Sequence, residues 1–233
     1  MTSIRATISE ATASPVGTAA ARARWASIAR AALPILLFSA LLAWDSVPAA
    51  AITHALSRLA YVGTVGVLLR RRSLRSGPAR RRERNFLRFR QTASMLMSND
   101  AVSFAALALL SAGSFHPVVP LPAVLAVAAV LIALGVGVKA WAARTLPPGA
   151  YYWRDFFVPP GPGPARATGP YRFLADPMYG VGYAHAYGLA LGLLSWPGLV
   201  AALFDQAAIL AFHAVVERPH VRALYGSARE DAP

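Results

Sequence analysis

The sequence predicts an all-α protein, a polytopic membrane helix bundle with about six transmembrane helices. Of the 233 residues, 56% are hydrophobic and 14% are charged, which is too apolar a composition for a soluble domain of this size. The apolar residues also form runs long enough to cross about 30 Å of hydrocarbon at 1.5 Å per helical residue. We therefore expect an integral membrane protein, in the inner membrane of a bacterium.

The N-terminal part predicts a tail followed by the first span. Residues 1–24 contain no apolar run, so we expect a flexible cytosolic tail there and one transmembrane domain over residues 25–233. Residues 28–44 predict the first span, with Pro34 as a kink that neighbouring helices tolerate.

The second predicted span, residues 49–69, contains His54 and Arg58. Polar residues inside a span are often functional. A structural role is also open, because Arg58 could reach the membrane surface or pair with Asp45, and we favour that interpretation.

An arginine-rich segment follows the second span. Ten arginines lie between Arg70 and Arg90, interrupted by one acid, Glu83. This pattern predicts a cytoplasmic loop that obeys the positive-inside rule, and binding of anionic lipid headgroups is compatible with it. Although the net charge is +13, no nucleic acid partner is expected, because the arginines lie mainly between apolar spans.

The third and fourth spans are predicted at residues 93–114 and 120–143. Asp100 is costly in lipid, so its face of the third span should point into the bundle, where it could line a substrate pocket. Gly135 and Gly137 in the fourth span lack the third glycine and the preceding strand of a dinucleotide-binding loop. Close helix packing explains them, or a cofactor that lies against bare backbone.

The segment 145–172 is rich in proline, glycine and aromatic residues. Aromatic residues beside a span usually form a belt at the membrane interface. The alternative is a lip over the entrance of an active site. The aromatic residues in question are Tyr151, Tyr152, Trp153, Phe156 and Phe157.

The last two spans, residues 178–194 and 199–216, predict a helical hairpin with its reversal at residues 195–198. Such a short connection brings the far ends of the two spans together on one side of the membrane. The polar residues expected to meet there are Arg172, Asp176, Glu217 and Arg222. With the arginine-rich segment in the cytosol, six spans place this end and both termini in the cytosol as well.

Two ordered segments resemble a known enzyme family. The GPYR run at 169–172 with DPMY at 176–179 resembles the GPYR-x-x-RHPxYxG signature of membrane-embedded isoprenylcysteine carboxyl methyltransferases and phospholipid N-methyltransferases. Residues 217–226 resemble the EE-x-x-L-x-x-x-FG segment of that family, and 135–141 is similar to the helix that precedes the signature. The resemblance covers roughly residues 120–226.

This resemblance implies a methyltransferase that uses S-adenosylmethionine, with its cofactor pocket formed by the last three spans at the cytosolic membrane face. The residues implied to bind the cofactor are Gly135, Gly137, Lys139, Tyr171, Arg172, Pro177, Tyr179, Glu217, Arg218 and Arg222. The residues implied to be catalytic are Asp176, Glu217 and His220.

The chemistry of methyl transfer suits these residue types. Glu217 and Asp176 would hold the ammonium group of the cofactor, and Arg172 or Arg222 its carboxylate. An amine acceptor must also lose a proton, for which Asp176 or His220 is a candidate base, whereas a carboxylate or thiol acceptor needs none. The acceptor, a lipid or another hydrophobic molecule, stays open among these three.

Other interpretations of the C-terminal residues stay open. The spacing of His213, Glu217 and His220 could hold a metal ion, but nothing else supplies clear ligands, so none is expected. A helix-end ion pair of Glu217 with Arg218 or Arg222 is a structural alternative.

Two alternative functions are also open. Ala175 and Asp176 stand where the family usually has Arg-His, which suggests a catalytically silent relative that acts in membrane binding or assembly. Asp100, Asp205 and His213 within spans suggest, less strongly, a small transporter. The sequence leaves the oligomeric state open.

Overall fold

Four long apolar helices dominate the fold. In a computed structural model, residues 32–158 and 168–225 are described, and their regular elements are all helical. The helices long and apolar enough to cross a membrane are α2 (Val47–Arg70), α4 (Ala79–Leu110), α5 (Leu121–Thr145) and the rod Trp196–Ala223. The predicted all-α membrane bundle is therefore confirmed. The predicted tail and both chain ends lie outside the described residues.

One of the six predicted spans is shorter than expected. The first span is described as the helix Ala32–Trp44, and residues 28–31 of the prediction lie outside the described residues. The fifth is reduced to α6 (Ala184–Gly192), which follows a 3-10 turn, η5 (Val181–Tyr183). The other short elements are α3 (Arg72–Arg75), η1 (Ala150–Tyr152), η2 (Arg154–Phe156) and η4 (Gly169–Arg172).

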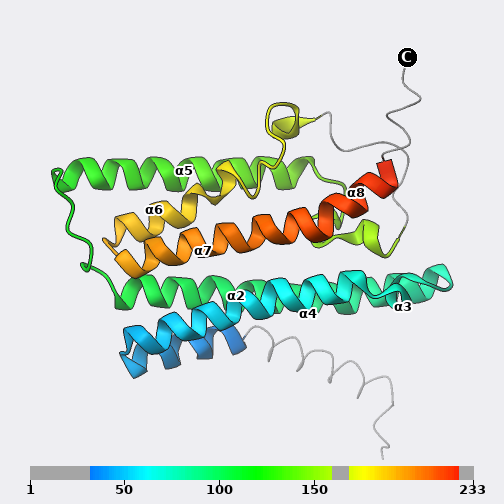
Figure 1. The fold of residues 1–233 in the computed structure, drawn as a ribbon, viewed down its shortest axis with the longest axis horizontal. Helices are drawn as coiled ribbons and strands as arrows, with labels where there is room; N and C mark the ends of the chain where they lie inside the picture. The colour runs from blue at the N-terminus through cyan, green and yellow to red at the C-terminus, as the bar shows by residue number, and fades with distance from the viewer. Residues whose placement is uncertain (1–31, 159–167, 226–233) are drawn as a thin grey trace, which may run out of the picture.

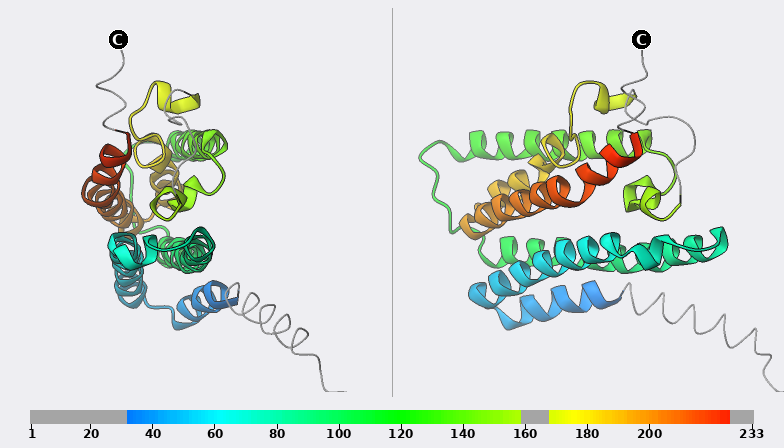
Figure 2. Two further views of the ribbon diagram at one scale, coloured as in Figure 1. Left: turned by 90° about the vertical axis from the view of Figure 1, so that its right-hand side faces the viewer. Right: turned by 45° about the vertical axis from the view of Figure 1, so that its right-hand side comes forward.

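The long helices run side by side in layers. Figure 1 shows α5 along one edge, followed by α6 and α7, then α2 and α4, with the blue helix Ala32–Trp44 at the opposite edge. The end-on view in Figure 2 shows the same order, with the helices roughly parallel. The short helices α3 and α8 (Arg218–Tyr225) both lie at one end of the bundle. The bundle therefore has one end where the arginine-rich segment and the C-terminal helix meet.

The arginine-rich segment is mostly helical, so its prediction as a loop was wrong. The third span begins at Ala79 rather than near residue 93, directly after Pro78. No proline or glycine occurs between Pro78 and Leu110, and Phe86 and Phe89 of this extension are buried. Arginine and leucine have high helix propensity. Burial of the face that carries the two phenylalanines adds stability, so the helix continues beyond its apolar part.

The fifth span is short because the chain coils tightly before it. Gly180 donates its N–H to the carbonyl of Asp176 at 2.8 Å, and Gly182 donates to the carbonyl of Pro177 at 2.8 Å. A Cβ atom on Gly182 would lie 2.7 Å from the Pro177 carbonyl oxygen. The coil therefore depends on a glycine at this position, and a regular α-helix begins only at Ala184.

The reversal into the last rod is closed by Ser195. Its backbone N–H donates to the carbonyl of Ala190, and its side-chain oxygen accepts the N–H of Gly198 at 2.8 Å as the N-cap of α7 (Trp196–Phe212). Leu194 reverses the chain with a φ of 52°. The turn thus lies slightly earlier than predicted, and Pro197 sits in the first turn of α7, where its missing N–H costs nothing.

Helices α5 and α6 approach each other closely at glycine positions. A Cβ atom on Gly135 would lie 2.3 Å from the backbone nitrogen of His185, and one on Gly188 would lie 2.7 Å from the carbonyl of Ala128. The expected close helix contact is therefore confirmed for Gly135. It was wrong for Gly137, which is exposed and whose Cβ would meet no atom within 4 Å.

Candidate functional site

The end of the hairpin carries a cluster centred on Glu217, a side chain that is 9% exposed. One oxygen of this carboxylate accepts a hydrogen bond from the Tyr179 hydroxyl at 2.7 Å and another from the indole N–H of Trp153. The other oxygen lies 2.5 Å from Nδ1 of His213. We call Trp153, Asp176, Tyr179, His213 and Glu217 the end cluster. Tyr179 and Glu217, both implied by the resemblance to bind the cofactor, are therefore in direct contact.

His213 joins the two carboxylates of the end cluster. Its Nε2 lies 2.8 Å from Oδ1 of Asp176, while its Nδ1 faces Glu217. Both ring nitrogens of the imidazole therefore lie close to carboxylate oxygens, which fixes the orientation of the ring. Asp176, which precedes the coil before α6, is in this way connected to the far end of the last rod.

The backbone under His213 and Glu217 is a π-helix, His213–Glu217, between α7 and α8. Such segments are often found at functional sites. Pro219 has no N–H and cannot donate to the carbonyl of Val215 four residues earlier. The guanidinium of Arg70 at the end of α2 supplies the missing donor at 3.0 Å. The predicted distortion near Pro219 is therefore present, and it does not end the helical rod.

The turn that carries Asp176 and Tyr179 is held against α7. The side-chain amide of Gln206 donates to the carbonyls of Tyr179 and Gly180, at 3.0 and 3.4 Å. Arg218 lies 3.4 Å from Oδ2 of Asp176. The structural alternative for Glu217 was therefore wrong for Arg218, whose partner is Asp176.

Other residues expected to bind a cofactor surround the end cluster less closely. Arg172 is exposed and lies over the ring of Phe173, and Arg222 is exposed on α8, so the predicted approach of these guanidinium groups to Glu217 is absent from the described contacts. Pro177 is fully buried. Burial, and after it the negative charges of Glu217 and Asp176, raise the pKa of Tyr171 to about 12. Tyr171 therefore lies close enough to sense both carboxylates.

His220 does not join the end cluster. Its ring stacks on Phe156 with centroids 3.5 Å apart, and its Nε2 lies 3.7 Å from Oδ2 of Asp155. Burial raises the pKa of the Asp155 carboxyl. His220 therefore contacts the aromatic segment rather than His213 or Glu217.

The aromatic segment is part of the protein interior, so its prediction as an interfacial belt was wrong for three of its members. Trp153, Phe156 and Phe157 are 7%, 6% and 2% exposed. Phe157 packs on Phe86 and Phe89 of the α4 extension, with ring centroids 6.0 and 4.9 Å apart. This packing supports the loop from which Trp153 reaches Glu217.

A second polar cluster lies within the membrane-spanning part of the bundle. Arg58 of α2 donates to Asp205 of α7 at 2.7 Å, pairs with Asp100 of α4 at 2.8 Å, and donates to the hydroxyl of Tyr183 at 2.6 Å. His54 lies 3.2 Å from Asp205. We call His54, Arg58, Asp100, Tyr183 and Asp205 the mid-span cluster. Arg58 does not pair with Asp45, so that alternative was wrong, whereas the inward orientation of Asp100 is confirmed.

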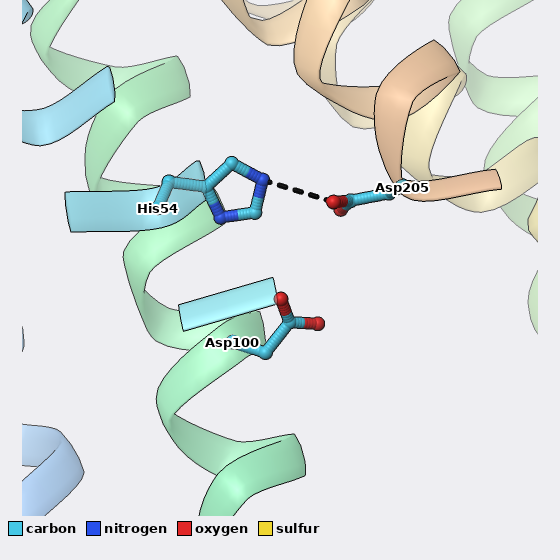
Figure 3. Close-up of side chains that lie close together, drawn as sticks. All are labelled: His54, Asp100 and Asp205. Carbon is cyan, nitrogen blue, oxygen red and sulfur yellow. Dashed lines mark ion pairs between the residues drawn. The ribbon is translucent and has the colours of Figure 1, made fainter. Parts of the chain in front are cut away.

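The mid-span cluster contains the geometry of a metal site, but its charges are already compensated. Figure 3 shows His54 facing Asp205 with Asp100 beside them, and one ligand atom from each lies within 4.8 Å of the others. Arg58 already pairs with both carboxylates. Lys139 adds a second cation, because its ammonium lies 4.9 Å from the ring centroid of Tyr183. A divalent ion would bring a large excess of positive charge into a low-dielectric region.

A groove in the bundle lies away from the end cluster. It has a volume of about 270 Å³, and its lining comes from α2, α4 and α7. Between Tyr179 and Glu217 the two side chains are hydrogen-bonded directly. A cofactor that enters between them must therefore separate this pair.

Two members of the end cluster were not assigned to the site from the sequence. His213 lies four residues before Glu217 and so shares its helix face, a spacing that could have identified it. Trp153 belongs to an irregular segment remote in sequence, and no local pattern connects it with Glu217.

The end cluster also has more carboxylates than cations, which suits a positively charged ligand.

Comparison with known proteins gives a consistent result over the C-terminal part. Residues 123–228 match the family model described as phospholipid methyltransferase. The phosphatidylethanolamine N-methyltransferase of Aspergillus flavus is 35% identical over 144 residues, and that of Chaetomium globosum is 31% identical over 147 residues. No solved structure matches the chain.

The relatives are much longer than this chain. Each alignment covers 60% of this chain, but 14% of the Aspergillus flavus protein and 15% of the Chaetomium globosum protein. The matched region contains all but the first two residues of α5, together with α6, the rod and the whole end cluster. Together with the four apolar helices, the match identifies an integral membrane protein. Over residues 123–228, this chain is similar to the phospholipid methyltransferase family.

Proposed function

We propose that this protein is an integral membrane methyltransferase that transfers a methyl group from S-adenosylmethionine to the amine of a phospholipid headgroup. The observation that carries this proposal is the end cluster. It places two carboxylates, bridged by His213, at the arginine-bearing end of a membrane bundle and inside the matched region. The names of the relatives support an amine acceptor.

Glu217 is the proposed anchor of the methyl donor. It is nearly buried, and it has no Arg or Lys within 4 Å among the described residues. A carboxylate in this state stabilises a nearby cation strongly. The donor supplies an electrophilic methyl group and an ammonium group, and Trp153 and Tyr179 would border it with aromatic surface. Gly137, with open space beside it, and Lys139 lie on the neighbouring helix.

Asp176 is the proposed base for the amine. A protonated headgroup amine cannot attack a methyl group, so a proton must leave before transfer. Asp176 is half-buried, and His213 connects it with Glu217. The Asp176–His213 pair can take up the proton from the amine nitrogen. His220 is a less suitable base, since it faces Asp155.

The end cluster is proposed to face the cytosol, in a bacterial inner membrane. The supporting observation is charge, because the arginines of residues 70–90 and of α8 lie at the same end of the bundle as Glu217. A soluble cofactor then reaches the site from the cytosol, and a lipid acceptor reaches it from the bilayer.

The test is methyl transfer by the purified full-length chain in nanodiscs that contain phosphatidylethanolamine. With S-adenosylmethionine labelled in the methyl group, mass spectrometry should detect labelled monomethyl lipid. Glu217→Gln keeps the size of the side chain but removes its charge, and should lower the rate by about 100-fold or more. Its melting temperature should stay within a few degrees of the parent.

Asp45→Asn is the matched control, because it makes the same chemical change at an exposed turn at the other end of the bundle. It should leave the rate unchanged. A folded parent chain that binds no S-adenosylmethionine at millimolar concentration would overturn the proposal, and would favour a catalytically silent relative.

A further inference from the structure

The helix α4 is too long for the hydrocarbon layer. Its 32 residues span about 48 Å, against about 30 Å of hydrocarbon. Counted back from Leu110, about 20 residues fill the apolar layer, which puts its boundary near Gln91. The turns from Ala79 to Arg90 therefore extend into the headgroup layer and beyond.

This extension has two different faces. Phe86 and Phe89 are buried on one face. The opposite face carries four exposed arginines at helical spacing, which we call the arginine face: Arg80, Arg81, Arg84 and Arg88. None of them forms an ion pair with an acid among the described residues, because the one acid of the segment, Glu83, pairs with Arg154 at 3.0 Å. The positive charge of this face is thus uncompensated.

The position of the arginine face matches lipid phosphates. At 1.5 Å per residue, Arg88 lies roughly 5 Å and Arg84 roughly 10 Å beyond the estimated hydrocarbon boundary. Both distances fall within the headgroup layer or about one Debye length of it. Leu87, which is 39% exposed, lies between Arg84 and Arg88 in the same layer.

Nucleic acid fits the same face less well. Proteins that bind single strands without sequence preference offer exposed aromatic rings for base stacking. The aromatic rings of this extension, Phe86 and Phe89, point into the protein and are 2% and 4% exposed. The helix also continues directly into the membrane, which keeps its arginines at the bilayer surface.

We propose that the arginine face of α4 binds the headgroups of anionic phospholipids. The guanidinium groups donate to phosphate oxygens, and each arginine close to an anionic surface contributes roughly a fivefold gain in binding. The binding does not depend on methyl transfer, so it can be tested separately from the proposed function.

The experiment reconstitutes the full-length chain in nanodiscs of phosphatidylcholine with phosphatidylglycerol. After the protein is released from the nanodiscs, native mass spectrometry counts the molecules of each lipid species that stay bound to it. Phosphatidylglycerol should be enriched above its bulk fraction, and the enrichment should fall as salt increases. In the triple variant Arg81→Gln, Arg84→Gln, Arg88→Gln, the preference for phosphatidylglycerol should fall about tenfold or more.

The matched control is the triple variant with lysine at the same three positions, which keeps the charge. It should retain most of the preference, and both variants should melt like the parent in pure phosphatidylcholine. An unchanged preference in the glutamine variant would overturn the proposal. Should the glutamine variant fail to fold, enrichment that is absent or insensitive to salt in the parent would overturn it, as would binding of a short oligonucleotide without lipid enrichment.

Discussion

The mid-span cluster and the end cluster use the same residue types for different purposes. Both contain a histidine, and both place a carboxylate of the last rod opposite a carboxylate from another segment. Asp205 and Glu217 are separated by twelve residues of helix, about 18 Å. In the mid-span cluster Arg58 bridges both carboxylates at 2.7 and 2.8 Å. In the end cluster Arg218 reaches one oxygen of Asp176 at 3.4 Å.

The difference in charge balance distinguishes structural from functional polar groups in this bundle. Carboxylates paired internally with Arg58 join α2, α4 and α7 and have little capacity for another cation. Glu217 has hydrogen-bond donors and His213 around it, so it still favours a cationic ligand. Of the three residues that suggested transport from the sequence, Asp100, Asp205 and His213, the first two are paired with Arg58.

The substitution Arg58→Met tests the structural role of the mid-span cluster, and it is expected to have the largest effect. It leaves Asp100 and Asp205 buried without their cation, and should lower the free energy of unfolding by about 3–5 kcal/mol. Thermal unfolding in nanodiscs measures this. Adding Asp100→Asn and Asp205→Asn to the same chain should recover much of the loss. A single variant as stable as the parent would show that the cluster does not hold the helices together.

The two histidines allow the second comparison. His213→Ala removes the link between Asp176 and Glu217, and should lower kcat by about 100-fold with little change in stability. His54→Ala removes the corresponding histidine of the mid-span cluster, and should change stability but leave kcat of the folded protein within a few-fold. Equal effects of the two variants on kcat would contradict the division into a structural and a functional cluster.

The two glycines of α5, Gly135 and Gly137, allow helix packing to be distinguished from cofactor binding. Gly135→Ala places a methyl group against the backbone of His185 and should destabilise the protein by about 1–3 kcal/mol. Gly137→Ala enters open space and should leave stability unchanged or raise it by up to about 1 kcal/mol. A higher KM for S-adenosylmethionine in Gly137→Ala alone would assign this backbone to the cofactor. The reverse order of stabilities would rule out the close α5–α6 contact.

The smallest effect concerns the excess of negative charge at the end cluster. The raised pKa of Tyr171, about 12, means that its protonated phenol contributes stability below pH 10 that is lost as the pH rises toward 12. Asp176→Asn should lower this pKa toward 10, because it removes a negative charge. NMR of ¹³C-labelled tyrosine measures the titration, with Tyr171→Phe for assignment. No change would mean that burial and Glu217 set the pKa without a contribution from Asp176.

The helical membrane architecture and the meeting of the two hairpin ends could both be predicted from the amino-acid sequence. Apolar runs determine which segments can cross a bilayer, because that depends only on length and hydrophobicity. A short turn at Ser195 then forces residues near Asp176 and Glu217 to the same end, whatever the rest of the bundle does. The family motifs lie in the same local segments, so they could be identified without coordinates.

The contacts between polar groups across the bundle could not be predicted from the sequence and became visible in the folded protein. Trp153 reaches Glu217 from an irregular segment, and Arg58 finds Asp100 and Asp205 on two other helices, contacts that no local spacing predicts. The helical extension of α4 is also a tertiary effect, since Phe86 and Phe89 are buried by the loop that carries Trp153. A periodic sequence pattern predicts which face of a helix is buried, whereas the segment that covers this face depends on how the helices pack.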